Sequence, residues 1–124
     1  MKTARQRVGD WGEALAAKYL REQGYVILTQ NWRHGHGELD IVAQRAEILT
    51  IVEVRTRRND KFGRGEESIT LSKRLNLIKT SQAYVQMLVP PDTELQWQID
   101  VIVIQLRPNN TLESLMHFPA AISA

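Results

Sequence analysis

Apolar residues recur at helical spacing in two segments of the chain. In the first, residues 8–23, they stand mostly three or four positions apart, and Gly24 directly after it is a typical helix terminator. The second, residues 71–88, has the same kind of spacing and stops before Pro90 and Pro91, which cannot continue a helix. The pattern therefore predicts one helix in each segment.

Other segments are rich in the β-branched and aromatic residues that favour strands. They are residues 25–32, 38–44, 48–57 and 97–106, with a shorter candidate at 114–118. The run 97–106 is almost continuously apolar, which is typical of a strand covered on both faces. The prediction is an α/β fold, a mixed sheet of four to five strands flanked by two helices in the order αβββαβ. With 124 residues, the chain has room for a single domain, residues 1–124.

Composition excludes several classes of protein. Hydrophobic residues make up 43% of the chain and charged residues 24%, which is ordinary for a folded globular domain. There is no apolar run of the roughly 18 residues that a membrane-spanning helix needs, and no apolar stretch follows the basic first residues as in a secretory signal. Because cysteine is absent, disulfides, thiol nucleophiles and thiolate metal sites are excluded. We expect a cytoplasmic protein that does not bind membranes.

Positive charge is concentrated in one part of the chain. The net charge is only +2, but the segment 55–64 carries +4, so the remainder sums to −2. The basic residues beyond position 55 are Arg57, Arg58, Lys61 and Arg64. Such a concentration is typical of a surface that binds nucleic-acid phosphates, although charge alone is equally compatible with a solvated loop.

Acidic residues interrupt two of the predicted strands. In strand 38–44, alternation places Leu39, Ile41 and Ala43 on one face and the acids Glu38 and Asp40 on the other. If the next strand pairs with it as a hairpin that sets position 44 opposite 49, Asp40 lies opposite Glu53 and Glu38 lies opposite Arg55.

Two carboxylates that are close together in a half-buried sheet repel each other unless something compensates their charge. Mg²⁺ or Mn²⁺ would do so, because these ions bind through one or two carboxylates and a substrate phosphate. The alternative is a cross-strand network in which Asp40 and Glu53 pair only with Arg55 and Arg57.

Short motifs over nearly the whole chain resemble the YraN-type uncharacterised protein family, which is related to the Holliday junction resolvases and restriction endonucleases of the PD-(D/E)xK nuclease superfamily. They are Gly12-Glu13, Asn31-Trp32-Arg33, Gly37-Glu38-Leu39-Asp40-Ile41-Val42, Val52-Glu53-Val54-Arg55-Thr56-Arg57, Phe62-Gly63, Lys73 and Ile99-Asp100-Val101. The resemblance implies a restriction endonuclease-like fold and a resolvase-like, metal-dependent endonuclease that acts on DNA. It also allows a homodimer.

The resemblance implies a role for each residue of the site. Asp40, Glu53 and the carbonyl of Val54 would hold the metal ion against the scissile phosphate. Glu13 matches an acidic position that related resolvases bring to the metal site, while the alternative for Glu13 is an ordinary acid in the first half of a helix.

Arg55 departs from the family pattern, which has lysine there. A guanidinium cannot take a proton from water, although it can donate paired hydrogen bonds to a phosphate. Lys73 could supply an amine instead, or could be a solvated lysine of the first helical turn. The departure suggests either a slow enzyme or the alternative function, a non-catalytic nucleic-acid-binding protein that retains the nuclease fold.

The other chemically suggestive residues point less clearly to a site. His34 and His36 lack a nearby third imidazole, since His117 is far along the chain, so a polar turn is favoured over a zinc site. Asp100 follows Gln98 where the family often has arginine, and we interpret it as a structural acid. The tryptophans Trp11, Trp32 and Trp97 fit core positions, and only one that faced solvent could stack on nucleic-acid bases.

Overall fold

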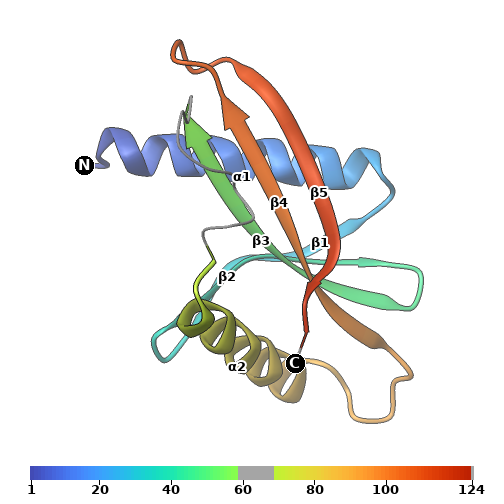
Figure 1. The fold of residues 1–124 in the computed structure, drawn as a ribbon. Helices are drawn as coiled ribbons and strands as arrows, with labels where there is room; N and C mark the ends of the chain where they lie inside the picture. The colour runs from blue at the N-terminus through green and yellow to red at the C-terminus, as the bar shows by residue number, and fades with distance from the viewer. Residues whose placement is uncertain (59–68, 124) are drawn as a thin grey trace.

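A computed structural model of the chain describes residues 1–58 and 69–123, which form two helices and one five-stranded sheet (Figure 1). The elements are α1 (Ala4–Glu22), β1 (Val26–His34), β2 (Gly37–Arg45), β3 (Ile48–Arg58), α2 (Leu71–Leu88), β4 (Gln96–Leu106) and β5 (Leu112–Ile122). The strands lie in chain order, β3 and β4 are parallel, and the other neighbours are antiparallel. The predicted α/β fold with a mixed sheet and two helices is confirmed, with β5 as a long fifth strand.

Local signals set the ends of both helices. Helix α1 begins four residues before the predicted start, because the Thr3 hydroxyl accepts from Gln6 N–H while the Gln6 side chain accepts from Thr3 N–H. It ends before Gly24, whose φ of 91° favours glycine. Helix α2 has the predicted bounds, with the Thr70 hydroxyl accepting from the backbone of Lys73. Among the described residues, no helix is long and apolar enough to cross a membrane.

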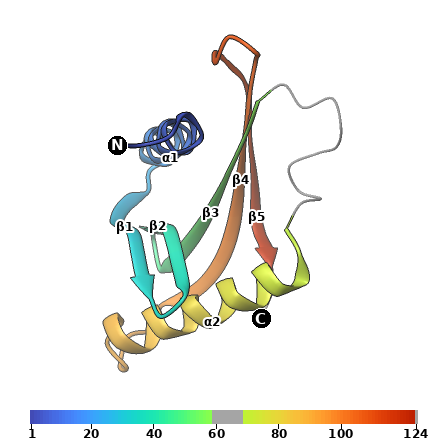
Figure 2. The same ribbon diagram turned by 90° about the vertical axis from the view of Figure 1, so that its left-hand side faces the viewer.

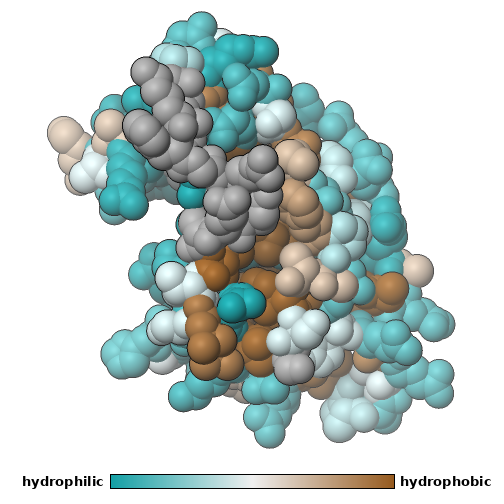
Figure 3. Space-filling view, viewed as in Figure 1, coloured by the Kyte–Doolittle hydropathy of each residue, from teal (hydrophilic) through white to brown (hydrophobic). Residues whose placement is uncertain are grey.

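The sheet buries a separate apolar cluster on each face. Figure 2 shows the sheet nearly edge-on, with α1 to one side and α2 across its lower end. Ile102 and Ile104 of β4 pack in the cluster with α1, whereas Val101 and Val103 pack in the cluster with α2. Strand β4 is therefore covered on both faces, as its apolar run predicts. The second cluster reaches the surface near α2, where Figure 3 shows apolar residues gathered.

The sheet bends between the β1–β2 hairpin and the other strands. Leu39 packs in the cluster under α2, whereas Ile41 and Ala43 pack in the cluster under α1. The prediction that these three side chains share a face is therefore wrong for Leu39. The alternation is interrupted at Asp40, and Asn31, which lies between the β1 partners of Ile41 and Leu39, has a left-handed φ of 54°.

Gly12 lets α1 approach β3 closely enough to place Glu13 over the sheet. A Cβ atom at Gly12 would lie 1.9 Å from Oγ1 of Thr56 in β3, whereas a Cβ atom at Gly9 would meet nothing within 4 Å. The two glycines lie in the same helix and differ in this contact, so they form a matched pair.

We expect Gly12→Ala to lower the free energy of unfolding by about 1–3 kcal/mol, because overpacking outweighs the gain in helix propensity. Gly9→Ala should instead raise it by up to about 1 kcal/mol, because alanine favours the helix and no contact opposes it. Urea denaturation of both variants measures the difference. Equal effects of the two substitutions would show that α1 can move away from β3 at no cost.

Candidate functional site

The two carboxyl groups meet where β2 separates from β3. The β2–β3 ladder has the predicted register, with Gln44 opposite Leu49, but it ends at Ile41 and Val52. The side chains of the next two residues, Asp40 and Glu53, line one cavity and are close enough for the charge of Asp40 to raise the pKa of Glu53. The predicted meeting of these carboxyl groups is thus confirmed, although through their side chains and beyond the end of the ladder.

The predicted strand pairing of Glu38 with Arg55 is wrong. Glu38 stands opposite Arg33 of β1, and its carboxylate lies 3.4 Å from Nε of Arg33. The physical reason is again the bend of β2, because its backbone ladder with β3 ends at Ile41 and Val52 whereas its ladder with β1 continues to Gly37 and His34.

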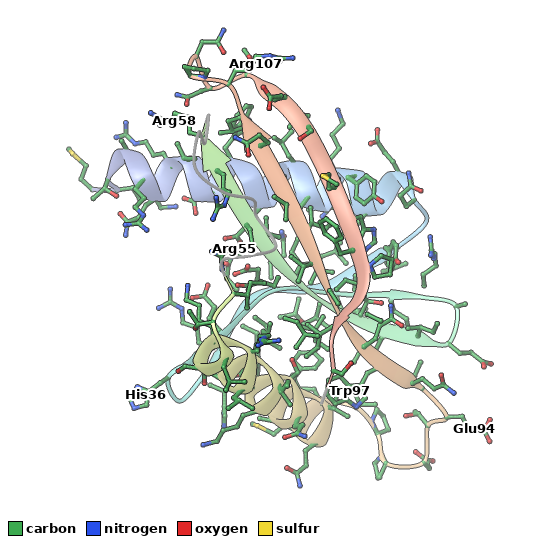
Figure 4. All side chains as sticks on the ribbon, viewed as in Figure 1. His36, Arg55, Arg58, Glu94, Trp97 and Arg107 are labelled. Atoms are coloured by element: carbon green, nitrogen blue, oxygen red, sulfur yellow. The ribbon has the colours of Figure 1, made fainter. Side chains whose placement is uncertain are left out.

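A cavity of about 350 Å³ lies over this point and brings the predicted site together. Its wall is formed by residues of α1, β2, β3 and the first turn of α2. Six of them are the predicted catalytic and metal-binding residues, Glu13, Asp40, Glu53, Val54, Arg55 and Lys73. Figure 4 shows Arg55 on β3 near the start of α2. Residues from four separate elements therefore line one cavity, although those of α1 and α2 are more than 30 positions apart in the sequence.

The acids of the cavity hold protons more tightly than free carboxyl groups do. Burial is the main cause of the raised pKa of Glu53, which reaches about 8 with the help of the neighbouring Asp40 charge. Burial also raises the pKa of Asp40, against the effect of the hydrogen bond from Val54 N–H, at 2.9 Å. For Glu13, burial together with the charges of Asp40 and Glu38 raises the pKa to about 7.

These donors fit a divalent cation. Both carboxyl groups are desolvated and close together, so their negative charges repel each other. A bound cation would remove this repulsion, and without a cation a bound proton does so. In a strand, the N–H and C=O of one residue point to the same side, so the carbonyl of Val54 faces the edge where its N–H meets Asp40. The described residues contain no ready-made group of three His, Asp or Glu side chains for a metal ion. The donor set is therefore two carboxylates and a carbonyl, which suits an ion that keeps waters and takes a substrate oxygen.

Without added metal, we expect the protein to become less stable as the pH rises from 5 to 8. The native state retains protons on Glu13 and Glu53 up to pH values near 7 and 8, whereas the unfolded chain releases them near 4.5. The native state thus binds more protons over this range, so its stability falls with pH. The two shifts alone would give about 6 kcal/mol, and solvent screening of these half-buried groups reduces the expected change to about 2 kcal/mol. Denaturation with urea at several pH values measures the slope.

Glu53→Gln should flatten this slope, because it removes the larger of the two titrations. Glu94→Gln is the matched control, since Glu94 is exposed in the loop before β4, far from Arg55 in Figure 4, and should leave the slope unchanged. A wild-type stability that rises between pH 5 and 8 would contradict the assignment of protons to this site.

Basic and aromatic residues extend the site along α1. A second hollow, of about 390 Å³, is lined by Arg7, Trp11 and Arg58 and shares Val8 with the first. Trp11 is 39% exposed, so the expectation of a core position is wrong for this tryptophan. Of the predicted nucleic-acid-binding residues, Arg57 is half-buried and Arg58 exposed at the end of β3, whereas Lys61 and Arg64 lie outside the described residues.

A polar cluster surrounds Asp100, which is completely buried, and the sequence did not predict it. Its carboxylate accepts from Nε2 of His117 at 2.7 Å, and the other ring nitrogen of His117 lies 2.9 Å from the hydroxyl of Tyr19. The acid itself was visible as an interruption of an apolar strand. Its contact with His117 could not be predicted, because the register of β4 and β5 shifts between Ile99 and Val101.

Comparison with known proteins places the chain in a family. The sequence model of "Uncharacterised protein family UPF0102" matches residues 12–104, which include Glu13, Asp40, Glu53 and Lys73. This chain belongs to the UPF0102 family. It is 40% identical over 122 residues to a UPF0102 protein of Roseiflexus castenholzii, covering 98% of each chain. It is 39% identical to a UPF0102 protein of Herpetosiphon aurantiacus, covering 97% of each. A UPF0102 protein of Bacteroides thetaiotaomicron is 43% identical over 96 residues, which are 77% of this chain and 72% of that one. The predicted YraN-type family membership is confirmed, and the match covers the elements that build the site.

Proposed function

We propose that this UPF0102 protein is a metal-dependent endonuclease that cleaves DNA phosphodiester bonds. The observation that carries the proposal is the pair Asp40 and Glu53, two carboxyl groups with pKa values raised by burial that lie together in the wall of an open cavity. Half-buried acids that repel each other are costly to a fold unless they have a task, and binding Mg²⁺ or Mn²⁺ is the task that suits oxygen donors.

The surface next to this pair supports a nucleic-acid substrate. Arg5 lines the carboxylate cavity, and Arg7 and Arg58 line the adjoining hollow, so cations border both. The exposed ring of Trp11 lies among them, and a base can stack on such a ring whatever its identity. A strand that runs through both hollows would place its backbone along the cations and one phosphate at the carboxyl pair.

The side chains divide the chemical work. Asp40, Glu53 and the Val54 carbonyl would hold the metal ion, which when bound activates a water molecule and neutralises charge on the phosphoryl oxygens. The Arg55 guanidinium would donate hydrogen bonds to the phosphate, and Lys73 would add a second positive charge from the opposite wall. Glu13, with a pKa of about 7, can release or accept a proton near neutral pH.

A second function, nucleic-acid binding without cleavage, is favoured by one observation. Arg55 occupies the wall position where a proton acceptor is expected, and a guanidinium does not give up its proton. The cationic surface would then bind DNA while the carboxyl pair contributed little to rate. Both functions predict binding, so only the cleavage separates them.

The experiment is incubation of the purified protein with labelled branched, duplex and single-stranded DNA in Mg²⁺, Mn²⁺ or a chelator. Cleavage that requires the metal supports the endonuclease. Binding that weakens steeply with salt, with no cleavage in any metal, supports the binding protein and contradicts the endonuclease. Absence of binding to all three DNA forms would contradict both functions.

A further inference from the structure

A third cavity, of about 200 Å³, lies under the last turns of α1 and shares no lining residue with the carboxylate cavity. Its wall includes a cation, a histidine, two tyrosines and an amide. They are Arg45, His117, Tyr19, Tyr25 and Gln98. Tyr19 follows Glu13 by six residues in α1, so their Cα atoms are roughly 9 Å apart along the helix axis.

The hydrogen bonds in its wall fix the proton positions in a chain of three groups. The buried carboxylate of Asp100 accepts from Gln98 Nε2 at 2.9 Å, from Ala120 N–H at 2.8 Å and from His117 Nε2 at 2.7 Å. Since a carboxylate only accepts, Nε2 of His117 must carry a proton. In the neutral ring Nδ1 then accepts the proton of the Tyr19 hydroxyl, at 2.9 Å.

Protonation of His117 would reverse the last of these bonds. Nδ1 then becomes a donor, the Tyr19 oxygen accepts, and the hydroxyl proton is released to point elsewhere. The groups that face His117 are Tyr19 from α1, Tyr25 before β1 with its ring 6.4 Å away, and Asp100 from β4. Asp100 already accepts three hydrogen bonds. Protonation of His117 therefore adds one hydrogen-bond donor and one positive charge to the cavity.

The remaining charged group of the wall is a second cation. The Arg45 guanidinium lies 4.3 Å from the centre of the Tyr25 ring and donates through Nη1 to the Gln23 carbonyl at 3.0 Å. These two contacts hold Arg45 at the cavity and leave further N–H groups of the guanidinium to donate. A compact oxyanion suits this small cavity, because Arg45 is a permanent cation in its wall and His117 becomes a second cation when it takes up a proton.

We propose that this cavity binds a small tetrahedral oxyanion of the phosphate class, and that binding is coupled to the uptake of one proton by His117. Arg45 and the turned hydroxyl of Tyr19 would bind the anion, while His117 donates to Tyr19 from behind. The phosphate group could be free or could end a nucleic-acid strand. The proposal does not rest on nuclease activity.

The test is a calorimetric titration of the full-length chain with sodium sulfate at constant ionic strength, at pH 6 and pH 8. Sulfate keeps its charge over this range, so a pH dependence must come from the protein. We expect binding to be about 10-fold tighter at pH 6, because a proton on His117 frees the Tyr19 hydroxyl to donate and adds a positive charge to the cavity. The heat of binding should also change with the ionisation enthalpy of the buffer, which reports the uptake of the proton.

Three variants separate binding from a merely structural hydrogen-bond chain. His117→Gln should remove the pH dependence, Tyr19→Phe should weaken binding at pH 6, and Arg45→Gln should abolish binding at both pH values. Tyr84→Phe is the control, since that hydroxyl lies 3.0 Å from the Thr29 hydroxyl and away from this cavity. If His117→Gln does not fold, Tyr19→Phe carries the test. The proposal is wrong if sulfate does not saturate the wild type, or if it binds the Arg45→Gln variant as tightly.

Competition identifies the source of the anion. Displacement of sulfate by inorganic phosphate alone indicates a free ion. Displacement by a 5′-phosphorylated oligonucleotide, but not by the same oligonucleotide with a 5′-hydroxyl group, indicates that the cavity binds the phosphate at the end of a nucleic-acid strand. Failure of both to displace sulfate contradicts a site for phosphate.

Discussion

In the variants Asp40→Asn and Glu53→Gln, we expect metal-dependent DNA cleavage to fall about 10³-fold or more. Each substitution keeps the size of the side chain but removes one of the two negative charges that would hold the cation. Loss of roughly 4 kcal/mol of transition-state stabilisation corresponds to that factor, and a bound metal ion supplies several kcal/mol. Single-turnover cleavage of a labelled DNA substrate at pH 8 measures the loss.

Stability distinguishes this loss of chemistry from unfolding. Since the wild-type pair is a repulsive one, Glu53→Gln should unfold at the same or a higher urea concentration than the wild type at pH 8. Glu94→Gln, an exposed acid with the same chemical change, should retain wild-type cleavage and stability. Cleavage that persists in both Asp40→Asn and Glu53→Gln would assign the activity to another site or to a contaminating nuclease.

Arg55→Lys is expected to raise the rate of cleavage about 10²-fold. An amine at the wall of the carboxylate cavity can lose its proton, whereas the guanidinium cannot, and a positioned general base commonly contributes 10²-fold or more. The rate of the variant should therefore rise with pH more steeply than that of the wild type. Cleavage measured from pH 6 to pH 9 tests both the size of the gain and the profile.

Two comparison variants make the result specific. Arg21→Lys, an exposed arginine near the end of α1, should change the rate less than about twofold. Lys73→Gln in the wild-type background should lower the rate if that amine already accepts the proton. An unchanged rate in Arg55→Lys, together with a strong loss in Lys73→Gln, would transfer the role of proton acceptor from position 55 to Lys73.

The apolar pattern was sufficient to place both helices and all five strands, because it persists over most of each element even where, as at Asp40 in β2, the alternation is interrupted. The bounds of α2 agree with the prediction, since Pro90 and Pro91 forbid its continuation. The early start of α1 was missed because it depends on two reciprocal hydrogen bonds between Thr3 and Gln6 rather than on burial. Intrinsic pattern and local capping thus act on different parts of the same helix.

Side-chain positions that depend on the bend of the sheet were harder to predict. Counting along a regular hairpin brought Asp40 to Glu53 correctly but also paired Glu38 with Arg55, because nothing in the alternation indicates where β2 leaves β3. Asn31, which tolerates a left-handed φ, is the residue that signals the bend. The contact of His117 with Asp100 was invisible for a similar reason, since it depends on a register shift between two strands.

Titration of the wild-type protein with Mn²⁺ at pH 8, followed by the electron paramagnetic resonance signal of free Mn²⁺, tests the account most directly. We predict one site with a Kd below about 1 mM that is lost in Asp40→Asn and Glu53→Gln and kept in Glu94→Gln. No saturable binding to the wild type, or equal binding to Glu53→Gln, would contradict the claim that Asp40 and Glu53 form a metal site.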